Sequence, residues 1–276
     1  MKDLIVDAWT ADVGHDFQAP AGFVDSVVSR VLASWEDGAD VVLMPEFLWL
    51  SLERFVTGLP QLATLFWEEI FPSLQAKLAQ PGKCVVLGTV PFQDGDVLRN
   101  RAVILVEGVL HFQDKMCLTP WEKDFRGGNG IGIWGFQGWR MGVLICLDVE
   151  IPDHSVTLRQ RNLDLLLVPS ATETILGTER IARCASARAV EIGCYVVVSH
   201  LVGKCESSLI DENLGRLSCY TPSQAAFRRG ARVDEGAVHE SGWEKRRFSL
   251  GASALKRMRR NHVETNPSTV FPTFLS

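Results

Sequence analysis

The sequence lacks the features that mark membrane, secreted and nucleic-acid-binding proteins. No apolar stretch approaches the length needed to cross a bilayer, and the first apolar run, which begins at Leu4, is too short for the core of a signal peptide. The formal net charge of −5 gives no excess of positive charge that would favour nucleic acid or an anionic membrane. We therefore expect a cytoplasmic protein with no nucleic-acid partner and no membrane partner.

Paired cysteine motifs are also missing. The seven cysteines, at positions 84, 117, 146, 184, 194, 205 and 219, form no CxxC pair and have no nearby histidine ligand. This pattern argues against both a disulfide framework and a zinc site. The composition, with 46% hydrophobic and 22% charged residues, is ordinary for a globular core, and a layered α/β fold can hold all 276 residues in one unit.

Buried strands and amphipathic helices alternate along the chain. Continuous apolar runs predict strands at residues 4–9, 41–44, 84–89, 141–145, 163–168 and 194–199. Helical periodicity predicts helices at residues 21–36, at 59–79 with a break at Pro72, and at 178–192. The pattern weakens after residue 211, with short strands expected at 217–220 and 236–239 and a helix at 252–260.

A predicted hairpin interrupts this alternation. It covers residues 97–112 and turns at Glu107-Gly108. An ordinary doubly wound parallel sheet fits less well because of this hairpin, whereas two sheets covered by helices satisfy both the apolar strands and the amphipathic helices. Residues 114–138, rich in charge, aromatics and glycine, are expected to form a loop that leads into the strand before Cys146.

Three reactive side chains each follow the end of a predicted strand. They are Glu46, Lys115 and Cys146, and residues at the ends of different strands of one scaffold can converge in space. A thiolate is a nucleophile, a nearby carboxylate can take its proton, and a lysine can stabilise the negative charge that develops on the substrate. Alone, Cys146 would be read as a small buried hydrophobe.

Two other readings compete with this trio. His154 or His200 could approach Cys146 to form a Cys–His hydrolase, although no spacing supports it. Residues 130–135 match the dinucleotide fingerprint GxGxxG, but a charged loop precedes them and a strand follows, so the required context is absent.

Three motifs resemble the signature regions of the nitrilase superfamily of carbon–nitrogen hydrolases. They are LMPEF at 43–47, DKMCLTPWE at 114–122 and CLDVEIP at 146–152, in the family's order and with comparable separations. The resemblance covers roughly residues 4–260, including a helix–strand segment at 187–199. It implies a four-layer α-β-β-α sandwich, with a carbon–nitrogen hydrolase domain at 1–260 and a C-terminal tail at 261–276.

The same resemblance implies roles for individual residues. Cys146 would be the nucleophile and Glu46 the general base and acid. Lys115 and the backbone N–H of Leu147 would stabilise the oxyanion, and Glu122 is the nearest match to a second glutamate that positions substrate or water. No metal and no organic cofactor is implied.

The implied reaction is hydrolysis of a non-peptide carbon–nitrogen bond. A small-molecule amide would give an acid and ammonia or amine through an acyl thioester, and a nitrile could react through the same residues. An amide is favoured, because true nitrilases place Trp-Glu directly after the cysteine where this chain has Leu147 and Asp148. The family also implies a homodimer or larger homo-oligomer, and a catalytically silent interaction protein of the same fold is the alternative.

Four further residues are candidates for substrate binding. Trp121, Arg126 and Trp134 lie in the 114–138 loop, which is expected to line the mouth of the site, and Glu173 follows the end of the strand at 163–168. Asp148 and Glu150 flank the cysteine turn, where local hydrogen bonding is the expected role.

Overall fold

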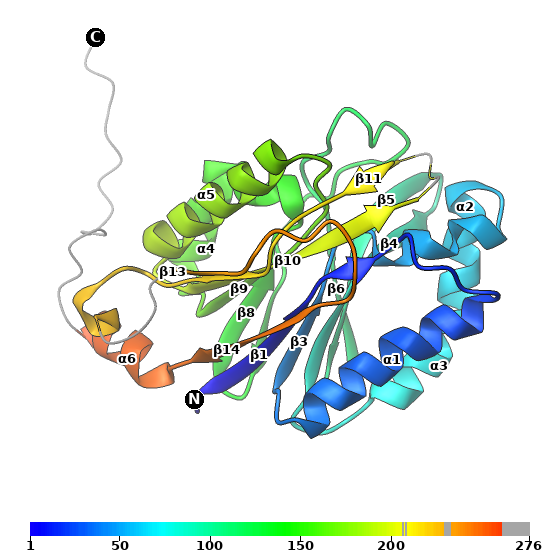
Figure 1. Ribbon diagram of the computed structural model, residues 1–276. Coiled ribbons are helices and arrows are strands. Elements are labelled where there is room, and N and C mark those ends of the chain that lie inside the picture. Colours follow the sequence, from blue (N-terminus) through cyan, green and yellow to red (C-terminus); the bar gives the residue numbers. More distant parts are fainter. Residues whose placement is uncertain (206, 208, 229–232, 261–276) are drawn as a thin grey trace, which may run out of the picture.

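The computed structural model describes residues 1–205, 207, 209–228 and 233–260 (Figure 1). The predicted tail at 261–276 lies outside the described residues. Within that part of the chain, one sheet has six strands in the order β14-β1-β3-β4-β5-β6. They are β1 (Leu4–Trp9), β3 (Val41–Met44), β4 (Cys84–Asp94), β5 (Val97–Val106), β6 (Val109–Asp114) and β14 (Lys245–Leu250).

A second sheet packs against the first. In the described residues its main path runs β13-β12-β10-β9-β8-β7, and β2 and β11 also pair with β10. Its strands are β2 (Ala11–Asp12), β7 (Ile133–Phe136), β8 (Trp139–Val143), β9 (Leu165–Ser170), β10 (Tyr195–Lys204), β11 (Glu212–Asn213), β12 (Ser218–Tyr220) and β13 (Val233–Glu235).

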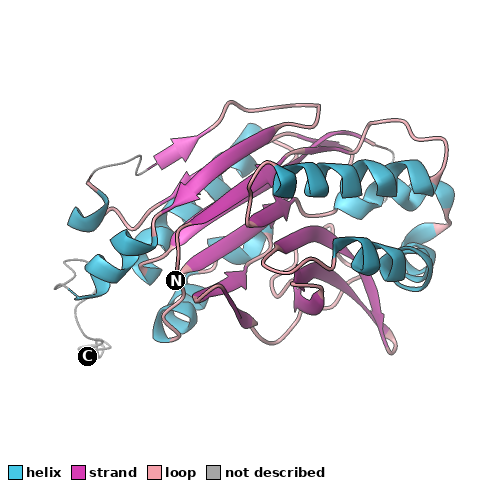
Figure 2. Ribbon diagram, turned by 90° about the horizontal axis from the view of Figure 1, so that it is seen from below, coloured by secondary structure: helices cyan, strands magenta, loops and turns pink. Residues whose placement is uncertain are grey.

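Helices cover the outer faces of both sheets (Figures 1 and 2). The first sheet carries α1 (Pro20–Glu36), α2 (Gly58–Thr64) and α3 (Phe71–Leu78), and the second carries α4 (Pro152–Gln160) and α5 (Ile175–Ile192). The remaining helical segments are η1 (Leu48–Phe55), η2 (Leu65–Ile70), η3 (Cys146–Glu150), η4 (Ala225–Phe227) and α6 (Ala252–Arg260).

Strand β3 shows how the layers form from the sequence. Successive side chains of a strand point to opposite faces. Val41 and Leu43 belong to the core between the two sheets, whereas Val42 and Met44 pack with the helices on the outer face. Both faces are therefore buried, which explains the continuous apolar run. The four-layer α-β-β-α sandwich expected from the sequence is confirmed.

Most predicted elements are present, and several boundaries move. The hairpin at Glu107-Gly108 is confirmed, with both residues in the left-handed region. The helix predicted at 59–79 is broken by the π-helical η2, and α3 carries Pro72 in its first turn. A proline ring clashes with the carbonyl four residues earlier, so the widened turn falls directly before it.

Two expectations for the later chain were wrong, and one strand was not predicted. The loop expected at 114–138 contains β7, which pairs with β8 as an antiparallel strand. The strand expected at 236–239 is absent from the described residues, where β13 ends at Glu235. β14 was not predicted, because its three basic residues mask the strand pattern. One of them, Arg247, reaches the buried Asp7 of β1 with two contacts of 2.7 and 2.8 Å.

Candidate active site

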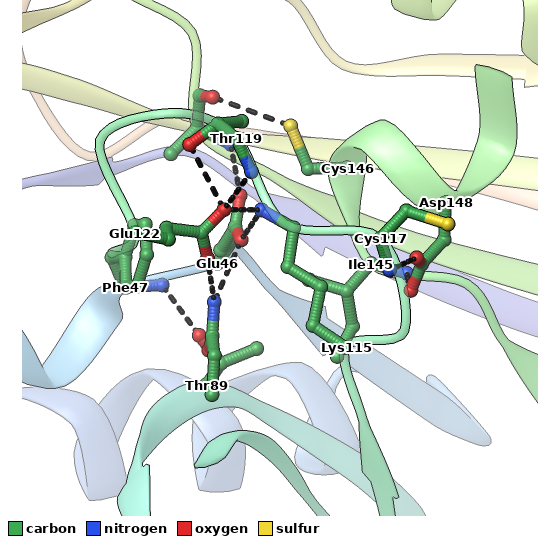
Figure 3. A network of polar contacts seen from close by, with 12 residues as sticks. Glu46, Phe47, Thr89, Lys115, Cys117, Thr119, Glu122, Ile145, Cys146 and Asp148 are labelled. Atoms are coloured by element: carbon green, nitrogen blue, oxygen red, sulfur yellow. Dashed lines mark hydrogen bonds and ion pairs between the residues drawn. The ribbon is translucent and has the colours of Figure 1, made fainter. Parts of the chain in front are cut away.

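The three predicted strand ends meet at one cavity of about 250 Å³. Figure 3 shows the side chains of Glu46, Lys115 and Cys146 near one another. Glu46 follows β3, Lys115 follows β6, and Cys146 lies three residues after β8 at the start of η3. All three line the cavity, together with Glu122. β3 is buried, β8 is largely buried, and β6 is exposed on part of its length, but all three strands are paired within a sheet, so the loops after them are held by a rigid scaffold.

Lys115 joins two carboxylates in a buried network. Its Nζ donates to Glu46 Oε1 at 2.8 Å and to Glu122 Oε2 at 2.7 Å, and all three side chains are at most 2% exposed (Figure 3). Buried charges are tolerated when they are paired and hydrogen-bonded. The sequence therefore identified a charge cluster whose members are in direct contact.

Asn100 and Thr119 complete the network, and the sequence reasoning missed both. Asn100 Nδ2 donates to Glu46 Oε1 and to Glu122 Oε1, each at 3.0 Å. Thr119 donates to Glu122 Oε2 through its backbone N–H at 2.9 Å and its hydroxyl at 3.0 Å. No local pattern marked Asn100, which lies between Arg99 and Arg101 in β5.

Burial controls the charge of these groups. It raises the pKa of Glu46 to about 7, and the positive charge of Lys115 opposes that rise without cancelling it. For Lys115, burial lowers the pKa, but the carboxylate of Glu46 and the other acidic groups raise it more, so the pKa stands above its usual value. Lys115 is thus a permanent cation beside a carboxyl that can gain or lose a proton near neutral pH.

Cys146 is held as a neutral thiol in a strained turn. Its φ of 46° lies in the left-handed region, which costs a non-glycine residue about 1–2 kcal/mol. Burial and the nearby Glu46 raise the pKa of the thiol above its usual value. The Sγ donates to the Ala171 carbonyl at 3.4 Å, and the Ala171 N–H donates to Glu46 Oε2 at 3.2 Å. One backbone unit therefore contacts both the thiol and the carboxyl.

Asp148 fastens the cysteine turn to the lysine segment. Its buried carboxylate accepts from the backbone N–H of Cys117 at 2.7 Å, of Met116 at 3.2 Å and of Ile145 at 3.3 Å. Burial raises the pKa of Asp148, and these backbone donors oppose the rise. The expected role of Asp148 in local hydrogen bonding is confirmed, and it extends to a segment some thirty residues away.

Most of the chain matches a known protein family. Residues 9–225 match the family model for carbon–nitrogen hydrolases. The chain belongs to the carbon–nitrogen hydrolase family.

The individual relatives of this chain have low sequence identity to it. Over 223 residues the chain is 25% identical to the probable hydrolase YhcX of Bacillus subtilis, covering 77% of this chain and 44% of YhcX. It is 28% identical to an (R)-stereoselective amidase of a Pseudomonas species, covering 66% of each chain. An amidase from Nesterenkonia has the same fold, with a TM-score of 0.70 at 18% identity over 94% of this chain and 95% of that one. The chain thus matches about half the length of YhcX.

The predicted substrate-binding residues of this family member fall into two groups. Trp121 and Glu173 line the cavity, as does Leu147, the expected oxyanion donor. Arg126 lies away from it, with its guanidinium donating to the carbonyls of Lys123 and Phe125. Trp134 is not among the described residues of the lining.

The position of Trp134 has a simple cause. It is buried in the inter-sheet core and stacks on His111 at 6.2 Å between ring centroids. Sequence proximity to Lys115 suggested the mouth of the site, but pairing of β7 with β8 carries the indole into the core.

The histidines of the alternative Cys–His arrangement have other partners. His154 Nδ1 contacts the Asp148 carbonyl at 2.9 Å, and His200 Nδ1 contacts the Arg216 carbonyl at 2.8 Å. Burial lowers the pKa of His200 to about 4. Among the described residues that line the cavity there is no histidine.

In the described ranges, no group of three or more His, Cys, Asp or Glu side chains is arranged to hold a metal ion. No helix in those same ranges is long and apolar enough to cross a bilayer.

Proposed function

We propose that this chain hydrolyses a small-molecule amide to an acid and ammonia or amine through a thioester on Cys146. The observation that carries the proposal is the contact of Lys115 with both Glu46 and Glu122 beside a buried thiol in one cavity. Two resemblances support it: a relative named as an amidase, and a Nesterenkonia amidase of the same fold described with acrylamide added at its active-site cysteine.

The first chemical step is proton transfer from Cys146 to Glu46. Because the pKa of the thiol is raised, the cysteine carries its proton at rest and needs a base. Glu46, with a pKa of about 7, is partly ionised at neutral pH and shares the Ala171 backbone with the thiol. The resulting thiolate attacks the amide carbonyl carbon, and the carbonyl π electrons move onto oxygen.

Lys115 and the backbone N–H of Leu147 then stabilise the oxyanion. Glu46 returns its proton to the amide nitrogen, the carbon–nitrogen bond breaks, and ammonia or amine leaves an acyl thioester. Water enters, loses a proton to Glu46 and attacks the thioester carbon. Collapse of the second tetrahedral intermediate releases the acid, and the sulfur regains its proton. General acid–base help of this kind is worth about 10²–10⁴-fold in rate.

Glu122 positions Lys115 in this scheme. It accepts from Lys115, Asn100 and Thr119, so it holds the ammonium away from a simple pair with Glu46. With two carboxylates sharing one lysine, Glu46 keeps a pKa near neutral and can exchange protons during turnover.

Ammonia release from a panel of short amides and the corresponding nitriles tests the proposal. The native protein should turn over an amide, and Cys146→Ala should reduce turnover to background while the fold survives. Cys184→Ala, at a half-buried position of α5 that does not line the cavity in the described residues, is the matched control. Mass spectrometry of quenched reactions should find an acyl group on Cys146. No turnover, together with an unmodified Cys146 after iodoacetamide, contradicts the proposal and favours an interaction protein; turnover of nitriles alone favours a nitrilase.

The proposal extends to the whole molecule. We assign the hydrolase domain to residues 1–260 and expect a cytoplasmic homodimer or larger homo-oligomer. Ile175 and Leu176, 43% and 66% exposed at the start of α5, support contact between copies through that helix. Sedimentation of the purified chain tests this assembly, and a monomer at micromolar concentration contradicts it.

A further inference from the structure

Asn213 is a buried polar side chain that the hydrolysis mechanism leaves without a task. It lines the same cavity as Cys146 and is 3% exposed. In the described part of the chain, neither Oδ1 nor Nδ2 of its side-chain amide has a hydrogen-bond partner. Burying an amide without a partner is costly, so such groups in native proteins call for an explanation.

The backbone around Asn213 fixes the direction of its side chain. In β11, Glu212 pairs with Lys204 of β10 and forms a 2.6 Å ion pair with it on the exposed side. Neighbouring side chains of a strand point to opposite faces, so Asn213 points inward. The next residue is anchored as well, because the Leu214 N–H donates to the Thr172 carbonyl at 2.9 Å.

The charges around the cavity disfavour an acidic substrate tail. Among the described lining residues, the cations are Lys115 and Arg180. Lys115 contacts two carboxylates, and Arg180 Nε lies 3.3 Å from Glu150 Oε2. Glu173 also lines the cavity, and burial, then the nearby Asp211 and Glu212, raises its pKa. A free carboxylate on the substrate would meet this acidic surface without an unpaired cation.

We propose that Asn213 is a specificity-determining residue that recognises a neutral carboxamide on the acyl chain. The Nδ2 donor and Oδ1 acceptor of Asn213 complement the acceptor and donor of a primary carboxamide, whereas a carboxylate offers acceptors only. The preferred substrates are therefore short diamides rather than monoamides with a free carboxylate. This inference rests on the proposed function, because it names the substrate class of the same site.

The cavity size agrees with a short substrate. Its volume of about 250 Å³ lies below the roughly 300–1,000 Å³ of sites for drug-sized ligands. Three amides of equal chain length differ in the group at the far end of the acyl chain. Glutaramide ends in a carboxamide, glutaramate in a carboxylate and pentanamide in a methyl group.

Ammonia release from these probes gives the first test. For the wild type, kcat/KM for glutaramide should exceed that for either other probe by about tenfold or more, the scale of one or two hydrogen bonds. Asn213→Leu, similar in size but apolar, should reduce that ratio about tenfold. Asn213→Asp removes the donor and adds a negative charge, so it should shift preference toward 5-aminopentanamide, whose tail is cationic. A merely structural role for Asn213 would lower all rates together and leave the ratios unchanged, and that result overturns the inference.

Lys204→Gln is the matched control. It disturbs the exposed ion pair with Glu212 on β11 but leaves the Asn213 amide in place. The glutaramide preference should survive in this variant. Loss of the preference in Lys204→Gln equal to that in Asn213→Leu would assign the effect to β11 as a whole and overturn the role of the amide.

Binding to Cys146→Ala separates this inference from the proposed function. By calorimetry, that variant should bind glutaramide about tenfold more tightly than glutaramate, and adding Asn213→Leu should remove the difference. If this holds while the wild type releases no ammonia from these probes or from the wider panel of amides, the role of Asn213 in binding the carboxamide stands and the amidase proposal falls. If the wild type hydrolyses pentanamide at least as well as glutaramide, or if Cys146→Ala binds no glutaramide at millimolar concentration, the inference falls.

Discussion

The carboxylate of Asp148 accepts a 2.7 Å hydrogen bond from the backbone N–H of Cys117. This contact ties the turn that carries Cys146 to the segment that carries Lys115. Both segments are loops after strands, and neither strand sets the distance between them directly. Asp148 therefore sets the geometry of the site although it does not line the cavity in the described residues.

Asp148→Asn tests this role. An amide in place of the carboxylate presents an NH₂ group to backbone donors, so at least one hydrogen bond of Met116, Cys117 or Ile145 is lost. We expect a loss of about 2–3 kcal/mol in the free energy of unfolding and a lower kcat, measured by urea denaturation and ammonia release. Asp96→Asn, in an exposed hairpin turn, should change stability by less than about 0.5 kcal/mol. Equal stability of the two variants would show that the contact does not anchor the turn.

The pKa of Glu46 predicts the acid limb of the pH profile. Below about pH 7 this carboxyl is protonated and cannot accept the thiol proton, so kcat/KM should fall about tenfold per pH unit and level off above. Rates of ammonia release between about pH 5 and pH 9 give the profile. His154→Gln should leave the limb in place. A limb that moves with His154 would favour the Cys–His alternative.

Removing Lys115 should expose the cost of burying two carboxylates. Lys115→Met leaves Glu46 and Glu122 without their shared cation, so we expect a loss of about 3–5 kcal/mol in stability near pH 8. The pKa of Glu46 is already raised by burial, and losing Lys115 raises it further. A raised pKa in the folded state stabilises the fold at low pH and loses that effect as pH rises.

The destabilisation by Lys115→Met should therefore shrink on acidification, as urea denaturation at several pH values would record. Activity should fall at least about 10²–10³-fold, the scale of losing one oxyanion donor. Lys123→Met, an exposed lysine in the same loop, is the control. A loss of stability that is independent of pH would contradict the coupling between Lys115 and the carboxyls.

The backbone of Gly88 packs closely against the turn that carries Glu46. A Cβ at Gly88 would lie 2.1 Å from the Pro45 carbonyl oxygen, and its φ of +68° also disfavours a side chain. Gly88→Ala should push the Pro45–Phe47 turn, destabilise the fold by more than about 2 kcal/mol and reduce kcat. Gly95→Ala shares the positive φ, at +58°, but meets nothing within 4 Å, so it should cost only about 1–2 kcal/mol. Thermal unfolding and ammonia release of both variants compare the two effects. Similar losses in both would assign the whole effect to backbone conformation.

The trio could be found in the sequence because each member lies shortly after the end of a predicted strand. A strand is recognisable without knowing its neighbours, and the reactive side chain beyond it marks the loop. Motif order then supplied the family and, through it, the four layers. Glu46, Lys115 and Cys146 could be predicted together for this reason, and their mutual contacts could not.

Asn100 and Asn213 needed the folded structure. Asn100 reaches two carboxylates because β5 lies beside β4 in a particular register, and no local pattern encodes that register. Asn213 sits in a two-residue strand whose inward direction depends on pairing with β10. Arg126 was predicted to bind substrate because it is near Lys115 in the sequence. In the structure its guanidinium donates to backbone carbonyls away from the cavity.

Ala171 makes two contacts of the site through its main chain, so they do not depend on which side chain stands at this position. Its carbonyl accepts from Cys146 and its N–H donates to Glu46, so both groups belong to the main chain. A substitution of Ala171 leaves both hydrogen bonds in place, provided that the backbone at the end of β9 keeps its conformation. The placement of the Cys146 thiol and the Glu46 carboxyl around this residue therefore depends on the course of the backbone after β9, and the identity of the side chain at position 171 does not encode it.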